Sequence, residues 1–251
     1  QWLGYLPLGL ELVGRYLVED TDLSIAEILE ELQEERLEYE AINPDSEDLE
    51  YTEMTAKLGV KAALNLTWEK LDDKTQKVGE LLSLFNPNEI TWEYVESVSE
   101  LLNWKNKDVI KAKKQLHELN FIKSLEREEE SYQFYPLIRE FLRTKLQLSP
   151  QKNDLKQVFI NSFIEISKTI PETTTLEFIN SVKNAIPHLQ EVLENLIDAI
   201  SDENLYYAFT GLARFYYGQG LYTLAEPWLQ QCVSTVRSRL GVNHLDTATS
   251  I

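Results

Sequence analysis

The chain is poor in cysteine, glycine and proline, and it has no long apolar run. A single cysteine, Cys232, among 251 residues excludes an intramolecular disulfide and fits a reducing, cytoplasmic environment. Nine glycines and eight prolines leave few turn signals, which disfavours a loop-rich β-sandwich and favours long helices with short connections. No stretch approaches the about 18 consecutive apolar residues of a membrane span, and no signal-peptide pattern is visible. We therefore expect a mainly α-helical cytoplasmic protein with no membrane contact.

Motifs that support catalysis are also missing. No Gly-x-x-x-x-Gly-Lys-Ser/Thr loop is present to hold the phosphates of a nucleotide. The three histidines, His117, His188 and His244, are far apart in the sequence, so we expect structural or surface roles rather than metal binding. Cys232 lies on an apolar helical stripe and is expected to be buried. The chain alone is thus predicted to be no enzyme and to hold no metal or cofactor.

Negative charge is concentrated near the start of the chain. The net charge is −18, and residues 19–53 carry 15 acidic side chains against one basic side chain, Arg36. This charge repels nucleic acid and anionic lipid. The acidic segment is either a solvated helix and loop or a face that docks a basic partner, and both interpretations stay open.

Helical periodicity and turn residues divide the chain into four parts. Both ends interrupt a helical pattern, so we expect a piece of a longer protein. The second part should contain four helices, then two short strands at 121–125 and 131–135, then a helix opened by Pro136, which is the order of a winged helix. Pro187 predicts a kink or break within a helical pattern that runs over 176–200. The predicted parts are a helical subdomain (1–55), a winged helix with a small β-hairpin (56–148), a linker of helical hairpins (149–203) and the start of a repeat solenoid (204–251).

The last part carries a repeat signature. The stretch from Leu212 to Cys232 (LARFYYGQGLYTLAEPWLQQC) resembles a tetratricopeptide repeat of the kinesin-light-chain type, and so does the tail LGVNHLDTA from Leu240, with Leu245 in place of a proline. The residues themselves predict two antiparallel helices joined at Gly218-Gln219-Gly220, with Tyr222, Ala225, Leu229, Cys232 and Val236 on the second.

Such repeats stack on one another, so without further repeats we expect the face with Trp228 and Val236 to be frayed, or else covered by another copy of the chain. They also bind proteins or peptides in a concave groove. Candidate partner-binding residues are Asn204, Arg214 and Gln219.

Two further stretches resemble the NB-ARC domains of STAND signalling ATPases, which include apoptosome and plant resistance proteins. The stretch GYLPLGLELVG at 4–14 is similar to the family's Gly-Leu-Pro-Leu-Ala motif, with Tyr5 in place of Gly and Gly9 in place of Ala. The stretch YQFYPLIREF at 132–141 matches the context of its Met-His-Asp motif. The resemblance implies nucleotide contacts for Pro7 and, through its hydroxyl in place of the family's His, for Tyr135.

Together these resemblances imply the regulatory and sensor part of a STAND-type ATPase. The winged helix would control an upstream nucleotide domain of the same chain that binds ADP or ATP, and the repeats would bind a protein or peptide trigger. One alternative is a transcription regulator, because Lys107, Lys111 and Lys114 share one face of the presumed recognition helix, although that helix has no arginine. Another alternative is a constitutive scaffold built on the repeats.

Overall fold

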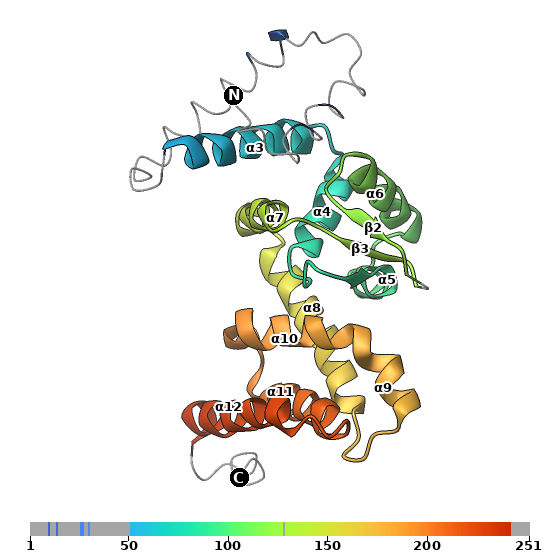
Figure 1. Ribbon diagram of the computed structural model, residues 1–251, viewed down its shortest axis with the longest axis vertical. Coiled ribbons are helices and arrows are strands. Elements are labelled where there is room, and N and C mark those ends of the chain that lie inside the picture. Colours follow the sequence, from blue (N-terminus) through green and yellow to red (C-terminus); the bar gives the residue numbers. More distant parts are fainter. Residues whose placement is uncertain are drawn as a thin grey trace.

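The computed structural model describes residues 51–127 and 129–241, with side chains from residue 59 onward, and a few single residues nearer the N-terminus. The described chain is mainly α-helical, as predicted, and it has one small three-stranded sheet where a two-stranded hairpin was expected. In Figure 1 it runs from α3 at one end to a pair of helices, α11 and α12, at the other. Pro7, most of the part predicted at 1–55 and the tail from residue 242 lie outside the described residues.

The first half of the described chain carries the sheet. From α4 to β3 the order is helix, strand, helix, helix, strand, strand, so a strand that was not expected lies between the helices, and we keep the name winged helix for the part from α3 to α7. Strand β3 lies between β1 and β2 and is antiparallel to both. The elements are α3 Tyr51–Glu69, α4 Asp73–Leu82, β1 Ile90–Thr91, α5 Trp92–Leu101, α6 Asn106–Glu118, β2 Lys123–Leu125, β3 Ser131–Gln133 and α7 Pro136–Leu148.

Local signals explain where several of these elements begin and end. Asp72 caps α4 by accepting a hydrogen bond from the Thr75 backbone N–H at 2.9 Å. Pro136 occupies the first turn of α7, where its missing N–H costs nothing. Tyr135, predicted at the end of a strand, is instead the residue before α7. Strand β1 was not predicted, because two residues are too few to show a period.

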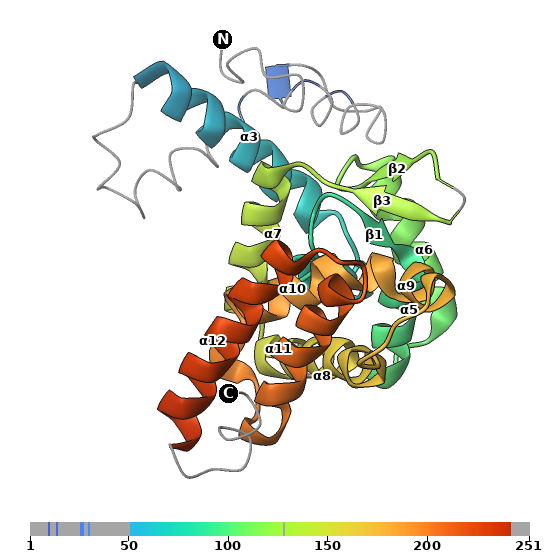
Figure 2. The same ribbon diagram turned by 60° about the horizontal axis from the view of Figure 1, so that its bottom comes forward.

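The second half is entirely helical in its regular elements. Pro187 lies in the first turn of α10 and follows a 3₁₀ turn, so the predicted break is confirmed. In Figure 2, α11 and α12 lie side by side and antiparallel, with the Gly218-Gln219-Gly220 turn between them. The elements are α8 Lys152–Thr169, α9 Leu176–Val182, η1 Lys183–Ala185, α10 Ile186–Asn195, η2 Ile197–Ala199, α11 Asp202–Tyr217 and α12 Tyr222–Leu240.

The five apolar residues assigned to α12 differ in their burial. Ala225, Cys232 and Val236 are buried, whereas Tyr222 and Leu229 are 59% and 41% exposed. The face with Trp228 and Val236 was expected to be frayed or covered by another copy of the chain, yet within this chain Val236 is fully buried and Trp228 packs against the core. One helical hairpin is therefore described, and the solenoid stays a prediction.

Helix α11 packs very closely on α8, and a glycine makes this contact possible. A Cβ built on Gly211 would lie 2.0 Å from Ser167 Oγ and 2.6 Å from the Ser167 carbonyl oxygen. The Ser167 hydroxyl donates to the Tyr207 carbonyl at 2.7 Å, which ties the two helices together. One continuous apolar core runs from α3 to α12 through this contact, so the winged helix and the hairpin share a single interior.

Candidate functional site

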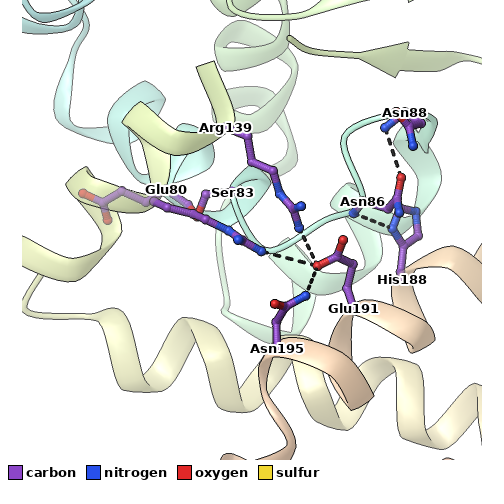
Figure 3. Close-up of polar contacts among 9 residues, drawn as sticks. Glu80, Ser83, Asn86, Asn88, Arg139, His188, Glu191 and Asn195 are labelled. Atoms are coloured by element: carbon purple, nitrogen blue, oxygen red, sulfur yellow. Dashed lines mark hydrogen bonds and ion pairs between the residues drawn. The ribbon is translucent and has the colours of Figure 1, made fainter. Parts of the chain in front are cut away.

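Buried charges lie where the winged helix meets the helices that follow it. Helix α7 places Arg139 and Arg143 one turn apart, and α10 places Glu191 and Asn195 one turn apart, so each pair faces the other helix. Glu191 Oε2 lies 2.5 Å from Arg139 Nη2 and 3.4 Å from Arg143 Nη2, and it accepts a hydrogen bond from Asn195 Nδ2 at 2.8 Å (Figure 3). We call these four residues, together with His188, the junction.

The junction depends on one carboxylate. Glu191 is only 6% exposed, so its charge is stable there only because two guanidinium groups balance it. The pKa of Arg143 is lowered, first by burial and then by the charge of Arg139. Removal of Glu191 would leave the largely buried Arg139 without a counter-charge. The ion pairs thus hold α7 to α10 through a contact that fails when one member is lost.

His188 lies one turn before Glu191 and is completely buried. The Asn86 backbone N–H donates to its Nδ1 at 3.1 Å, and the rings of Phe85, Tyr94 and Phe163 surround it at centroid distances of 4.9, 6.0 and 5.1 Å. Burial, with the Arg139 charge adding to it, lowers the His188 pKa to about 3. The ring is therefore neutral, and it joins the loop after α4 to α8 and α10.

Sequence reasoning assigned His188 a structural or surface role, and the structure makes it structural. Arg139 and Glu191 were not singled out from the sequence. The i,i+4 spacing of Arg139 with Arg143, and of Glu191 with Asn195, is visible there. Glu191 lies 48 residues after Arg143, however, so no local pattern shows that α7 and α10 meet.

Tyr135 lies at the start of α7, on the edge of the winged helix. It is 42% exposed, and the Lys123 ammonium donates to its hydroxyl oxygen at 2.9 Å while lying 4.8 Å from its ring centroid. An exposed hydroxyl next to an ammonium group suits an anion. Pro7, the other residue expected to contact nucleotide, lies outside the described part, so the structure does not relate the two.

The three candidate partner-binding residues do not form one cluster. Asn204 lies in the first turn of α11 and Gln219 follows its last turn, about 22 Å away at 1.5 Å per residue. Arg214 donates to the Ile170 carbonyl at 3.4 Å and to Glu172 Oε1 at 3.3 Å, on the loop after α8. Gln219 donates to the Phe215 carbonyl at 2.9 Å. Arg214 and Gln219 are therefore already engaged within the chain.

The lysines of α6 are largely neutralised. The Lys111 ammonium lowers the Asp72 pKa to about 2 by donating a hydrogen bond to its carboxylate, and the Thr75 backbone N–H adds to this effect. Three lysines of this helix form ion pairs: Lys111 with Asp72 at 2.5 Å, Lys113 with Glu130 at 2.7 Å and Lys114 with Glu118 at 3.6 Å. The fourth lysine of the helix, Lys107, is exposed. A helix with these pairs offers little free positive charge to a DNA backbone.

An apolar surface covers one end of the α11–α12 hairpin. Its side chains are between 42% and 59% exposed, and the rings of Tyr217 and Tyr222 touch at a centroid distance of 5.0 Å. We call the exposed apolar residues around the turn, Tyr217, Leu221 and Tyr222, the hairpin face, while Leu224 and Leu229 are exposed farther along α12. Neighbouring exposed apolar side chains on a folded protein mark sites of protein contact.

The remaining features to consider are Cys232, possible metal ligands and possible membrane-spanning helices. Cys232 is buried at 1% exposure, as predicted. Over residues 51–127 and 129–241 no group of three or more His, Cys, Asp or Glu side chains is placed to hold a metal ion. Within the same ranges no helix combines the length and apolar character needed to cross a membrane.

Comparisons with known proteins identified no relative of this chain. No protein-family model, no curated protein and no solved structure matches the chain.

Proposed function

We propose that this chain is the regulatory and sensor part of a STAND-type ATPase of the cytoplasm. The winged helix controls a nucleotide domain encoded upstream in the same protein, which binds ADP or ATP. The helical hairpin begins an array of tetratricopeptide repeats that binds a protein or peptide trigger. The chain itself carries out no catalysis.

The junction is the observation that carries this proposal. It joins the winged helix to the helices leading to the hairpin through buried charges and a buried histidine, rather than through a loose linker. A sensor must transmit a change at one end to the other, and packed elements with buried polar contacts respond in discrete steps rather than by gradual bending. Breaking the Glu191 contacts would uncouple the two halves.

The edge around Tyr135 supports a contact with nucleotide. The Tyr135 hydroxyl accepts a hydrogen bond from Lys123, so its own proton remains to be donated to a phosphate oxygen. The Lys123 ammonium adds a positive charge beside it. In the resembled family the corresponding histidine contacts a phosphate, and the Tyr135–Lys123 pair offers the same kind of group.

The hairpin face supports a protein partner. Three large apolar or aromatic side chains, Tyr217, Leu221 and Tyr222, are exposed around the turn between α11 and α12, and their burial by a partner would contribute binding energy in proportion to the area covered. The close Gly211–Ser167 contact joins α11 to α8, and α8 supplies Phe163 to the His188 site. A partner on the hairpin is thus linked to the junction by two steps of direct packing.

The test is the ATPase rate of the protein encoded by the complete gene. We expect a phosphate-binding loop upstream of Gln1, a low basal rate and a several-fold higher rate in a Glu191→Ala variant, because the uncoupled winged helix no longer restrains the nucleotide domain. Glu165→Ala, which removes an exposed carboxylate of α8, is the matched control and should leave the rate unchanged.

Absence of the loop from the gene would overturn the proposal and favour a scaffold or a transcription regulator. Equal rates for the wild-type protein and the Glu191 variant would overturn the role of the junction.

A further inference from the structure

A cleft of about 360 Å³ lies between α5 and the start of α6 in the winged helix. Three carboxylates from α5 line it, those of Glu93, Glu96 and Glu100, and Ser99 and Trp104 line it as well. The glutamates are spaced i, i+3 and i+7, so they share one face of the helix and form a row about 10 Å long. None of the residues of the junction or of the hairpin face takes part in this cleft.

The row of carboxylates is unfavourable for the isolated winged helix. Like charges three and four residues apart on a helix repel each other. Glu100 also lies in the last turn of α5, where the helix dipole disfavours negative charge, and that turn contains no basic residue. Among the ion pairs of the described residues none involves these three glutamates. A cation supplied by another molecule would relieve both effects.

Two further side chains point to an organic cation that also donates hydrogen bonds. Ser99 is 1% exposed, and its hydroxyl has no hydrogen-bond partner although such groups are nearly always paired when buried. Trp104 is half-buried, and it also lines a neighbouring cleft of about 290 Å³ that contains Lys74 and Lys105. The acidic cleft is therefore bounded by an indole ring, with positive charge beyond it.

We propose that this cleft binds an arginine side chain from a basic segment of a partner protein. The planar guanidinium group has a fork of N–H donors that matches carboxylate oxygens, and it stacks on an indole face, whereas a lysine ammonium group offers neither geometry. The about 10 Å row of carboxylates matches basic residues placed one helical turn apart. This inference does not depend on the proposed ATPase control, because it rests on α5 and Trp104 alone.

The probe is a blocked, fluorescein-labelled alanine-based helical peptide with arginines at positions i, i+3 and i+7. Fluorescence anisotropy at 0.15 M salt measures its dissociation constant for the whole chain and for variants. We expect Glu96→Gln with Glu100→Gln to weaken binding about tenfold. The control, Glu177→Gln with Glu203→Gln, removes the same charge from exposed positions on α9 and α11 and should change the dissociation constant less than twofold.

A second peptide, with lysine at the three positions, distinguishes specific binding of the guanidinium group from general attraction between opposite charges. We expect it to bind several-fold more weakly, and Trp104→Leu to remove most of that difference. Equal weakening by both pairs of glutamate substitutions would overturn the site. Equal affinity of the arginine and lysine peptides for the wild-type chain would overturn the assignment of arginine. Circular dichroism of every variant checks that the helices are intact, and the isosteric glutamine variants keep the test valid if Trp104→Leu unfolds.

Discussion

Replacement of Glu191 by alanine should destabilise the chain far more than the loss of an ordinary surface carboxylate. Glu191 is 6% exposed, and its nearest partner, Arg139, has a side chain that is only 16% exposed. Removing one member of a buried ion pair costs about 3–5 kcal/mol, mainly because the other charge stays buried without a partner. The contact with Arg143, whose side chain is 41% exposed, adds little. We expect the free energy of unfolding to fall by about 3 kcal/mol.

The assay is urea unfolding followed by circular dichroism, with thermal melting as a second measure. In a chain of this length about 1 kcal/mol corresponds to about 2–4 °C, so the melting temperature should fall by roughly 6–12 °C. Glu165→Ala is the control, since Glu165 pairs with Lys168 at 2.7 Å but is 68% exposed, and its loss should cost under about 0.5 kcal/mol.

A double substitution tests the cause of the loss. Arg139→Met combined with Glu191→Leu removes both charges and keeps the volume, so it should restore most of the stability that Glu191→Ala loses. If Glu191→Ala costs no more than Glu165→Ala, the junction is not a buried ionic contact and the reasoning is refuted.

The unfolded chain binds a proton at His188 with the ordinary pKa of about 6.5, whereas the folded chain does so only near pH 3. The free energy of unfolding should therefore fall by about 2 kcal/mol between pH 6.5 and pH 5. Urea unfolding of a His188→Gln variant should lack this pH dependence, and an equal pH dependence in the variant would contradict the prediction. Gly211→Ala should lower the free energy of unfolding by about 2 kcal/mol or more, because its methyl group would clash with Ser167. Gly14→Ala, whose added carbon has no atom of the described residues within 4 Å, should lower it little or not at all. Duplex DNA at physiological salt should bind weakly, and Lys107→Glu with Lys111→Glu should leave a mobility-shift assay unchanged; a shift that these substitutions abolish would favour the transcription regulator.

The helices of this fold could be predicted well from the sequence because their signals are local. The break at Pro187 and the turn at Gly218-Gln219-Gly220 follow from backbone restrictions of single residues, and the structure has both. Strand β1 escaped prediction because its two residues pair with a strand about 40 positions later. Local pattern carries no information on such a pairing.

The candidate site was harder to predict than the fold for the same reason. Tyr135 could be singled out by resemblance, but its contact with Lys123 depends on how the hairpin closes. His188 and Glu191 are distant in sequence from Asn86 and Arg139, and only the packing of α10 on the winged helix brings them together. The exposure of Leu229 could not be predicted, because helical spacing assigns a face to a residue without showing how much of that face a neighbour covers.

The central claim is that this chain regulates a nucleotide domain through the Tyr135 edge of its winged helix. The most direct test is a calorimetric titration of ADP into three samples: the 251-residue chain, the complete protein and the complete protein with Tyr135→Phe. We predict that the chain alone has no dissociation constant below about 1 μM, since it lacks the phosphate-binding loop. The complete protein should bind ADP, and loss of a hydrogen bond to a charged phosphate should weaken that binding about tenfold in the variant. Tight binding of ADP by the chain alone, or an unchanged dissociation constant in the variant, would contradict the account.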